Sequence, residues 1–357
     1  MKILLRDLRW GPGCRTKKIV CGLSRVRVIL WAALLGAGVC RATIPEGTGI
    51  NVHFSGGHES ELRLIEGCGF RVVRMDFSWK ETERRRGVYN FSSYGGLTSN
   101  LTRNGMRALF ILDYSNPLYR PDGVSPGTPE SREAFVRWAV AAARRFPGTT
   151  WEIWNEPNNG FWRPWPDVKD YLALAISTAR AIRHADPTAT ILAPAVLHFD
   201  WRFIQSVLRS PLPDLVDGFS VHPYMKAPVE RALPNYDRLK RMLFWRSPWR
   251  RIPVVCSEWG VSSFEGDGGT TPAEQAVLLQ RLLLTNLAAG VPLSIWYDWM
   301  DDGSNPRERE HHFGLLDPHG HPKPAYFAAR EILRELNGFR LERRVRTASP
   351  DDFLLLF

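Results

Sequence analysis

From residue 49 onwards, short apolar runs alternate with longer segments in which apolar residues recur at helical spacing. Short runs of continuous apolar character are typical of parallel strands that are covered on both faces. The clearest predicted helices cover residues 130–146, 167–186, 272–290 and 323–337. The eight predicted strands cover residues 49–54, 70–77, 107–113, 150–155, 190–194, 216–221, 253–257 and 293–298.

Eight strands that each precede a helix predict a (β/α)8 barrel, an α/β fold that needs roughly 250 residues or more. A doubly wound open sheet is the alternative, but it usually has fewer strands and tends to carry a glycine-rich phosphate loop after its first strand. The sequence SGG at residues 55–57 does not have that fingerprint. We therefore expect one barrel domain over residues 43–338.

The last residues, 339–357, predict a separate β element. Their sequence, FRLERRVRTASPDDFLLLF, is typical of two strands around a Ser-Pro-Asp-Asp turn. Because an isolated hairpin is only marginally stable, we expect these strands to pack on the barrel or to begin a β side domain that this chain leaves incomplete.

The first 42 residues differ from the rest in charge. They hold nine of the 47 Lys and Arg residues but one of the 37 Asp and Glu residues, so the remaining body is nearly neutral. A near-neutral body argues against a nucleic-acid partner. Within this segment a basic stretch precedes an apolar run over residues 28–40 and then small residues, as in a signal peptide cleaved after Ala42.

The apolar run is shorter than a comfortable bilayer span, which favours a cleaved signal peptide over a retained signal anchor. Both alternatives place the protein on the export route. We expect it in the periplasm, outside the cell, or tethered to a membrane by residues 1–42 and facing outward.

Three of the five cysteines lie in this leader, and Cys68 and Cys256 remain in the body. Two cysteines do not make a metal framework, and their predicted places lie on nearly opposite sides of the barrel. We therefore expect two buried free thiols. The loop over residues 301–321 is rich in Asp and His but has no clear ligand spacing, so we expect no metal and no cofactor.

Two glutamates stand at the carboxyl ends of predicted strands, where barrel enzymes hold their active sites. Glu156 follows the fourth strand in the sequence NEP, and Glu258 ends the seventh in SEWG. Two carboxyl groups that face each other across the barrel mouth suit glycoside hydrolysis. One must protonate the leaving oxygen while the other, ionised, attacks the anomeric carbon.

Neighbouring side chains predict how the two carboxyls divide these roles. We expect Arg74 and the hydroxyl of Tyr224 to stabilise an ionised Glu258, the nucleophile. Burial of Glu156 among tryptophans is expected to raise the pKa of its carboxyl, as a general acid requires. Asn155 is expected to hydrogen-bond a sugar 2-hydroxyl.

Further candidates for substrate binding fall at or just past strand ends. Two are histidines, and four are aromatic residues whose flat faces suit sugar rings. They are His53, His222, Trp79, Tyr114, Trp162 and Trp296. Packing in the core or in a loop is the alternative for each of them, and Asp76 and Asp113 are interpreted as structural carboxyls.

The stretch WEIWNEPN (151–158) resembles the acid/base motif of clan A, the retaining glycosidases with the (β/α)8 fold. PVVCSEWG (253–260) resembles the clan's nucleophile strand, and HPY (222–224) its sixth-strand motif. FRVVRMDFSWKETERRRGVYNFSSYGGL (70–97) and FGLLDPHGHPKPAYFAAR (313–330) look most like family 39, with family 5 close behind. The clan also carries a Trp on strand 8, which favours Trp296 among the aromatic candidates.

This resemblance implies retaining hydrolysis of a β-linked oligo- or polysaccharide through a covalent glycosyl-enzyme, with the two carboxyls about 5–5.5 Å apart. The Trp-rich loops after the fourth and eighth strands favour an endo-acting enzyme on a cell-surface or secreted polysaccharide. Two alternatives stay open. One is an exo-acting β-glycosidase such as a β-xylosidase, and the other is a barrel that binds glycan without cleaving it, against which the presence of both glutamates counts.

Overall fold

The computed structural model describes residues 2–5, 44–225, 228–345 and 353–357. These residues belong to two compact units. The larger unit is Pro45–Glu335, and the smaller one contains the described residues on either side of it.

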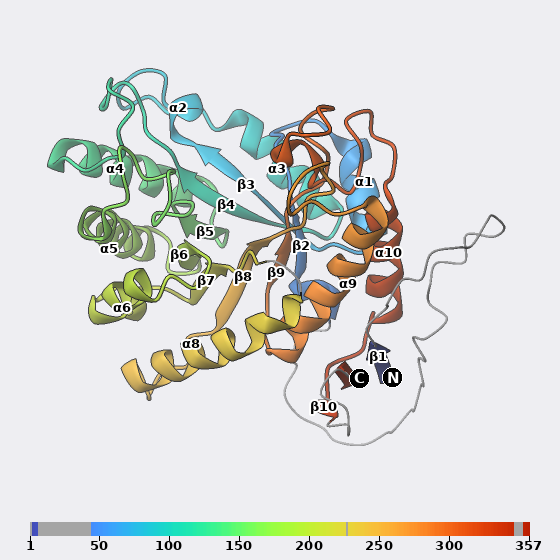
Figure 1. Ribbon diagram of the computed structural model, residues 1–357. Coiled ribbons are helices and arrows are strands. Elements are labelled where there is room, and N and C mark those ends of the chain that lie inside the picture. The colour runs from blue at the N-terminus through green and yellow to red at the C-terminus, as the bar shows by residue number, and fades with distance from the viewer. Residues whose placement is uncertain (1, 6–43, 226–227, 346–352) are drawn as a thin grey trace. The chain divides into compact units, whose positions relative to one another are not determined.

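Eight parallel strands close into a barrel in the larger unit, in the order in which they occur along the chain (Figure 1). The last strand pairs with the first in parallel, with Gly49 opposite Ile295. This confirms the predicted (β/α)8 barrel, and each predicted strand overlaps an observed one. The strands are β2 (Thr48–Asn51), β3 (Val72–Ser78), β4 (Arg107–Asp113), β5 (Thr150–Ile153), β6 (Thr190–Leu197), β7 (Gly218–His222), β8 (Val254–Trp259) and β9 (Ser294–Trp296).

Helices lie between successive strands along the chain and surround the barrel (Figure 1). Two of them begin where the sequence predicts caps. The side chain of Thr271 accepts a hydrogen bond from the backbone N–H of Glu274, and Asp167 caps its helix in the same way. The helices are α1 (Glu59–Cys68), α2 (Trp79–Thr82), α3 (Ser92–Arg103), α4 (Pro129–Arg145), α5 (Val168–Ala185), α6 (Trp201–Arg209), α7 (Leu212–Leu215), α8 (Ala232–Arg246), α9 (Pro272–Ala288) and α10 (Pro324–Glu335).

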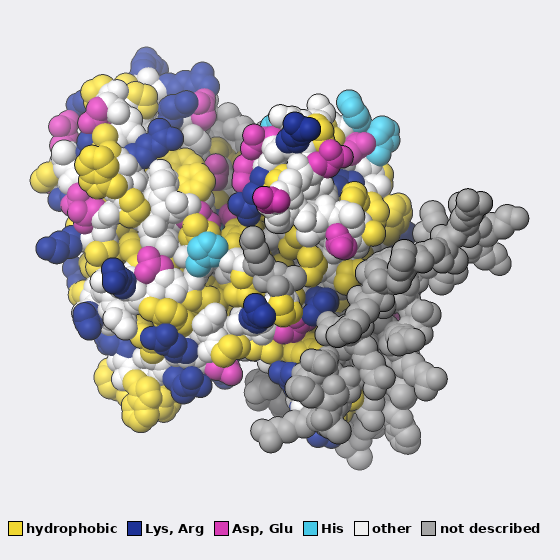
Figure 2. All heavy atoms as spheres, in the orientation of Figure 1, with side chains coloured by type: hydrophobic (Ala, Val, Ile, Leu, Met, Phe, Trp, Pro, Cys, Tyr) yellow, Lys and Arg dark blue, Asp and Glu magenta, His cyan; other side chains and the backbone are white. Residues whose placement is uncertain are grey.

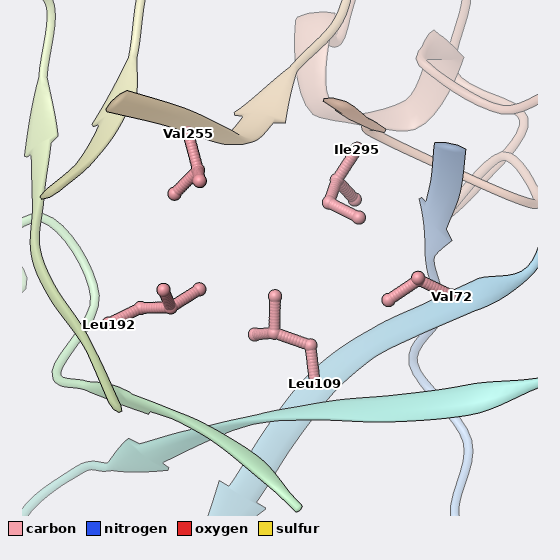
Figure 3. Packing of buried hydrophobic residues seen from close by; sticks show 5 residues of the cluster. All are labelled: Val72, Leu109, Leu192, Val255 and Ile295. Atoms are coloured by element: carbon pink, nitrogen blue, oxygen red, sulfur yellow. The ribbon is translucent and has the colours of Figure 1, made fainter. Parts of the chain in front are cut away.

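Branched aliphatic side chains fill the base of the barrel. Five of them, from β3, β4, β6, β8 and β9, point toward one another inside the ring of strands (Figure 3). They are Val72, Leu109, Leu192, Val255 and Ile295. Each lies near the start of its strand, so this apolar layer closes the amino end of the barrel. The polar side chains further along the strands are left to form its mouth.

Cys68 and Cys256 are both buried and free, as predicted. Burial raises the pKa of each thiol to about 12. Because the thiolate is the reactive form, both side chains act as small apolar groups in the core.

The smaller unit contains a three-stranded antiparallel sheet in the order β1 (Lys2–Leu5), β11 (Phe353–Leu356), β10 (Arg343–Val345). Strands β10 and β11 are the pair predicted within residues 339–357, and the turn between them lies outside the described residues. Strand β1 was not expected, because the sequence analysis assigned its residues to the leader.

Apart from strand β1, the predicted leader of residues 1–42 lies outside the described residues, so its cleavage and the export of the protein stay predictions. Among the helices that the structure describes, none combines the length and the apolar content that crossing a membrane requires.

Candidate active site

A pocket of about 370 Å³ opens at the carboxyl ends of the barrel strands. Its volume lies toward the lower end of the range for small-molecule sites, roughly 300–1,000 Å³. Seven of the eleven predicted site residues line it. They are His53, Arg74, Tyr114, Asn155, Glu156, Tyr224 and Glu258.

Glu156 stands just past the end of β5, on a backbone that turns sharply. Trp154 and Glu156 have φ angles of 69° and 45°, in the left-handed region that side chains other than glycine rarely adopt. Such strained residues cluster at functional sites. The carboxyl oxygen Oε1 of Glu156 lies 2.8 Å from Nδ1 of His222, which is fully buried at the end of β7. His222 thus supports Glu156 from behind instead of lining the pocket.

The predicted rise in the pKa of Glu156 is wrong. Burial does raise the pKa of this carboxyl, but the hydrogen bonds with His222 and Asn159 outweigh burial and hold it below the ordinary value of 4.5. The aromatic neighbours of Glu156 in the sequence do not indicate these two polar contacts, because His222 comes from a distant strand and Asn159 from the turn after β5. Nδ1 of His222 and Oε1 of Glu156 are 2.8 Å apart, so a proton between them can reside on either atom.

Glu258 lies at the end of β8, and each of its carboxylate oxygens accepts a hydrogen bond. The guanidinium Nη1 of Arg74 donates to Oε2 at 2.6 Å, and the hydroxyl of Tyr224 donates to Oε1 at 2.7 Å. These are the two contacts that the sequence analysis expected. Donors of this kind stabilise the ionised carboxylate and fix its orientation.

Arg74 joins Glu258 to the rest of the site. It is 1% exposed and also donates to Glu152 at 2.9 Å, to Asn51 at 3.0 Å and to Asn155 at 2.8 Å. Sequence reasoning missed Glu152 and Asn51. A signal was available, because Glu152 is a charged residue inside a strand that is otherwise apolar, and a fully buried charge requires a partner.

The two glutamates approach each other closely. One oxygen of Glu156, one oxygen of Glu258 and one ring nitrogen of His222 all lie within 4.8 Å of one another. The carboxyl groups are therefore near enough to act on opposite sides of the same glycosidic bond.

One side of the pocket is polar. Nε2 of His53 lies 3.2 Å from Oδ2 of Asp298, a carboxyl that is itself 1% exposed. Burial lowers the pKa of His53, but Asp298 more than offsets this and raises it to about 9. Asp76 also lines the pocket, with Asp113 buried beside it. The prediction that Asp76 has only a structural role therefore does not account for its place in the pocket. Burial raises the pKa of both of these carboxyls.

Aromatic side chains form the other walls of the pocket. Tyr297 lies 5.4 Å from Phe313 between ring centroids, and Tyr114 is stacked on Phe161 at 5.6 Å. The sequence did not identify Tyr297 as a pocket residue, although its neighbour Trp296 was predicted to bind substrate. The period of two along a strand places only one of two adjacent side chains toward the barrel axis.

A short 3-10 helix, η3 (Arg309–His312), adds two charged residues to the pocket lining, Arg309 and Glu310. The guanidinium of Arg309 lies 5.2 Å from the ring centroid of Phe313. Nothing in the sequence pattern identified them, because their place depends on the path of a long loop.

Three predicted sugar-binding tryptophans are buried and do not line the pocket, which corrects the expectation for each. Trp79 is packed between Tyr119 and Trp138. Trp162 lies 5.0 Å from the ring of Trp154. Trp296 points outward to the helix layer, where it lies beside residues of α9 and α10, because its neighbour Ile295 points into the barrel.

Two groups of three residues within the described part of the chain have ligand atoms close enough to hold a metal ion. One group is Glu156 and Glu258 of the pocket together with His222, which lies behind Glu156. The other is His53, Asp298 and Asp302. Within this second group, Nε2 of His53 lies 3.2 Å from Oδ2 of Asp298.

Comparison with known proteins identifies the family. Residues 40–302 match the family model described as cellulase (glycosyl hydrolase family 5). A β-xylosidase of Caldicellulosiruptor saccharolyticus is 27% identical over 222 residues, which cover 56% of this chain and 43% of that protein. A β-xylosidase of Geobacillus stearothermophilus is 28% identical over 205 residues, covering 50% and 40%. The matched parts therefore span less than half the length of these curated relatives.

Solved structures of glycoside hydrolases resemble this chain as well. A family 39 glycoside hydrolase from Bacteroides cellulosilyticus WH2 superposes with a TM-score of 0.75 at 27% identity, covering 85% of this chain and 66% of that one. A monomeric β-xylosidase from Caulobacter crescentus CB15 has the same fold, with a TM-score of 0.62 at 20% identity, covering 80% and 67%. The chain therefore belongs to the cellulase (glycosyl hydrolase family 5) family, within the clan A glycoside hydrolases that also include family 39.

Proposed function

We propose that this protein is a retaining glycoside hydrolase of β-linked sugars, with Glu258 as nucleophile and Glu156 as general acid and base. The observation that carries the proposal is the pair of carboxyl groups whose oxygens lie within 4.8 Å of each other at the mouth of the barrel. Retaining enzymes hold their carboxyls about 5–5.5 Å apart, whereas inverting enzymes need about 6.5–9.5 Å to admit a water molecule between them.

In the first step an oxygen of Glu258 forms a bond to the anomeric carbon, while the bond from that carbon to the leaving oxygen breaks. Glu156 gives its proton to the leaving oxygen. In the second step Glu156, now a carboxylate, removes a proton from water, whose oxygen attacks the anomeric carbon and releases Glu258. Two inversions leave the product with the anomeric configuration of the substrate.

The hydrogen bonds around the two glutamates support this division of roles. Arg74 and Tyr224 both donate to Glu258, and these two hydrogen bonds orient its carboxylate for attack. Glu156 accepts no hydrogen bond from Arg74; instead its Oε1 lies at hydrogen-bond distance, 2.8 Å, from Nδ1 of His222. In this proposal the general acid is the pair formed by Glu156 and His222, because burial alone raises the pKa of Glu156 but its contacts with His222 and Asn159 hold that pKa below the ordinary value.

We propose exo-acting hydrolysis in preference to the endo action that the sequence analysis favoured. The pocket of about 370 Å³ is small for a cleft that accommodates a polysaccharide chain. The two curated relatives are both named β-xylosidases, so aryl β-xylosides and short xylo-oligosaccharides are the first substrates to test. Release of single sugars from the chain end would support exo action, whereas products of mixed length would favour the endo alternative.

The protein can be tested as an enzyme with aryl β-glycosides. Replacing the nucleophile in Glu258→Gln is expected to lower kcat/KM at least about a thousandfold, because no covalent intermediate forms. Glu308→Gln, an exposed acid of the loop before η3, serves as the matched control and should keep normal activity. NMR of the first product should show the anomer of the substrate.

Four results would contradict the proposal. Hydrolysis by Glu258→Gln at the normal rate would exclude Glu258 as nucleophile, and a fluoroglycoside that labels another residue would do the same. An inverted product anomer would exclude the retaining mechanism. Tight binding of sugars by the unaltered protein without any turnover would favour the glycan-binding alternative.

We also propose that the protein is exported, on the strength of the basic and apolar pattern within residues 1–42. Sequencing the amino terminus of protein purified from its own cells tests this. A mature chain that begins just after Ala42 supports a cleaved signal peptide, and a chain that begins at Met1 and stays in the cytosol contradicts export.

A further inference from the structure

The end of α8 and the turn that follows it carry large aromatic side chains in water. Phe244, Trp245 and Trp249 are 57%, 78% and 80% exposed, and the two tryptophans are the most exposed large hydrophobic residues in the described part of the chain. The rings of Phe244 and Trp245 lie 5.6 Å apart. Contiguous exposed aromatic groups on a folded protein mark an interaction surface.

The same segment is strongly basic. Residues 238–251, RLKRMLFWRSPWRR, contain six Lys and Arg residues and no Asp or Glu. Two exposed arginines, Arg241 and Arg251, make no ion pair with a carboxylate within the parts of the chain that the structure describes. We call the five residues Phe244, Trp245, Trp249, Arg241 and Arg251 the α8 tip. Figure 2 shows hydrophobic side chains projecting at this end of α8, with Lys and Arg side chains beside them.

Two other arginines fix the segment to the barrel, so that the aromatic rings project on a rigid support. Arg246 donates to the carbonyl of Leu208 at 2.9 Å and to Asp214 at 2.6 Å, and Arg250 donates to the carbonyl of Pro213 at 3.1 Å. A surface that is already ordered loses little conformational entropy when it binds.

The chemistry of the α8 tip fits an anionic lipid surface. Tryptophan and phenylalanine favour the boundary between lipid headgroups and acyl chains, and nearby arginines attract anionic headgroups. A sugar site would also need side chains that accept hydrogen bonds from hydroxyls. Residues 238–251 offer no Asn, Gln, Asp or Glu, and their one serine, Ser247, is 1% exposed. A neutral polysaccharide is therefore a poorer partner than a bilayer.

We propose that the α8 tip docks the barrel onto a membrane that contains anionic lipids. Helix α8 follows β7 and runs back to the start of β8, so its last turn lies at the amino end of the strands. The pocket opens at the carboxyl end of the same strands. Docking through the α8 tip thus turns the pocket away from the lipid, toward a substrate outside it.

Co-sedimentation of the full chain with vesicles tests the proposal. We expect binding to vesicles of equal amounts of phosphatidylcholine and phosphatidylglycerol, and weaker binding to phosphatidylcholine alone. The double variant Trp245→Ser/Trp249→Ser should bind the mixed vesicles roughly tenfold or more weakly, because both interfacial anchors are lost. The double variant Arg241→Gln/Arg251→Gln should bind the mixed vesicles more weakly than the unaltered protein does, but its binding to phosphatidylcholine alone should be unchanged.

The matched control is Trp165→Ser, since Trp165 is 72% exposed but lies in the loop between β5 and α5, not in the α8 tip. It should bind vesicles as the unaltered protein does. Thermal melting of each variant checks that it is folded. If the leader alone bound the vesicles, the unaltered protein and all these variants would bind equally. Equal binding would therefore overturn the proposal.

Two other results would also overturn it. Loss of binding to dextran sulfate in the tryptophan variant, with no vesicle binding by the unaltered protein, would make the α8 tip a polyanion site. Self-association that the tryptophan variant abolishes, again without vesicle binding, would make it an interface between two copies of the chain.

Discussion

At the scale of single residues, the guanidinium of Arg74 lies between two carboxylates. Glu152 is 0% exposed and pairs with Arg74 at 2.9 Å, while Glu258 pairs with it at 2.6 Å from the pocket side. A buried charge is costly without a partner, so Glu152 holds the cation inside the barrel, and the cation then orients the proposed nucleophile.

Removal of Arg74 should therefore destabilise the fold as well as the site. Arg74→Met is expected to lower the free energy of unfolding by about 3–5 kcal/mol, because it leaves the Glu152 carboxylate buried without its cation. Adding Glu152→Gln should restore part of this stability without restoring hydrolysis. Urea denaturation measures the first effect and turnover of an aryl glycoside the second. Equal stability of the single and double variants would show that the two side chains are not coupled.

The ion pair of His53 and Asp298 makes a second prediction at this scale. Asp298→Asn should lower the pKa of His53 from about 9 toward its ordinary value of 6.5, because the imidazolium loses its carboxylate. NMR titration of the imidazole signals measures this. Asp317→Asn, beside the exposed His321, is the control that should leave His53 unchanged. A pKa of His53 that stays near 9 in Asp298→Asn would assign its rise to another group.

The same shift sets a pH dependence of stability. The pKa of His53 is higher in the folded than in the unfolded chain, so its protonation favours folding. This contribution is complete below about pH 6.5 and is lost as the pH rises through about 9. The His53 side chain is 45% exposed, so solvent screens the pair and the effect on the free energy of unfolding is small.

At the scale of elements, the hydrophobic pattern was sufficient to predict all eight barrel strands and the helices α4, α5, α9 and α10, since continuous apolar runs and capped helical segments have distinct periods. Strand order then predicted that Glu156 and Glu258 meet. The direction of each side chain was harder. Trp296 is a strand-end residue like Tyr297, but the period of two sends it to the helices and Tyr297 to the pocket. The contacts that lower the pKa of Glu156 come from other strands and loops, which no local pattern specifies.

Barrel closure depends on one small residue of the first strand. A Cβ on Gly49 would lie 2.5 Å from the carbonyl oxygen of Val72 and 2.4 Å from Cδ1 of Ile295, between the two strands that β2 joins. Gly49→Ala is therefore expected to lower the free energy of unfolding by about 1–3 kcal/mol. Gly67→Ala, on the exposed face of α1 with no atom near the new Cβ, should raise it by about 0.5–1 kcal/mol. Denaturant melts of the two variants measure this, and shifts of the same sign would contradict the close packing of β2.

At the scale of the whole molecule, the two ends of the barrel are built for different chemistry. The carboxyl end holds the polar pocket, and the amino end is closed by the aliphatic layer of Figure 3, beyond which α8 carries its exposed aromatic tip. No charged side chain belongs to that layer, so the electrostatic network around Arg74 does not continue through it. Changes at sites that share no partners usually have additive effects.

We therefore expect the two proposed activities to be separable. Trp245→Ser/Trp249→Ser should weaken vesicle binding but leave kcat/KM on a soluble aryl glycoside unchanged, and Glu258→Gln should abolish hydrolysis but leave vesicle binding unchanged. Assaying both variants for both properties tests this. On a polymeric substrate that is anchored in the vesicle and extends outward beyond the barrel, the tryptophan variant should be slower than the unaltered protein, because docking raises the local enzyme concentration. Equal rates on that substrate would mean that docking, even if it occurs, does not serve hydrolysis.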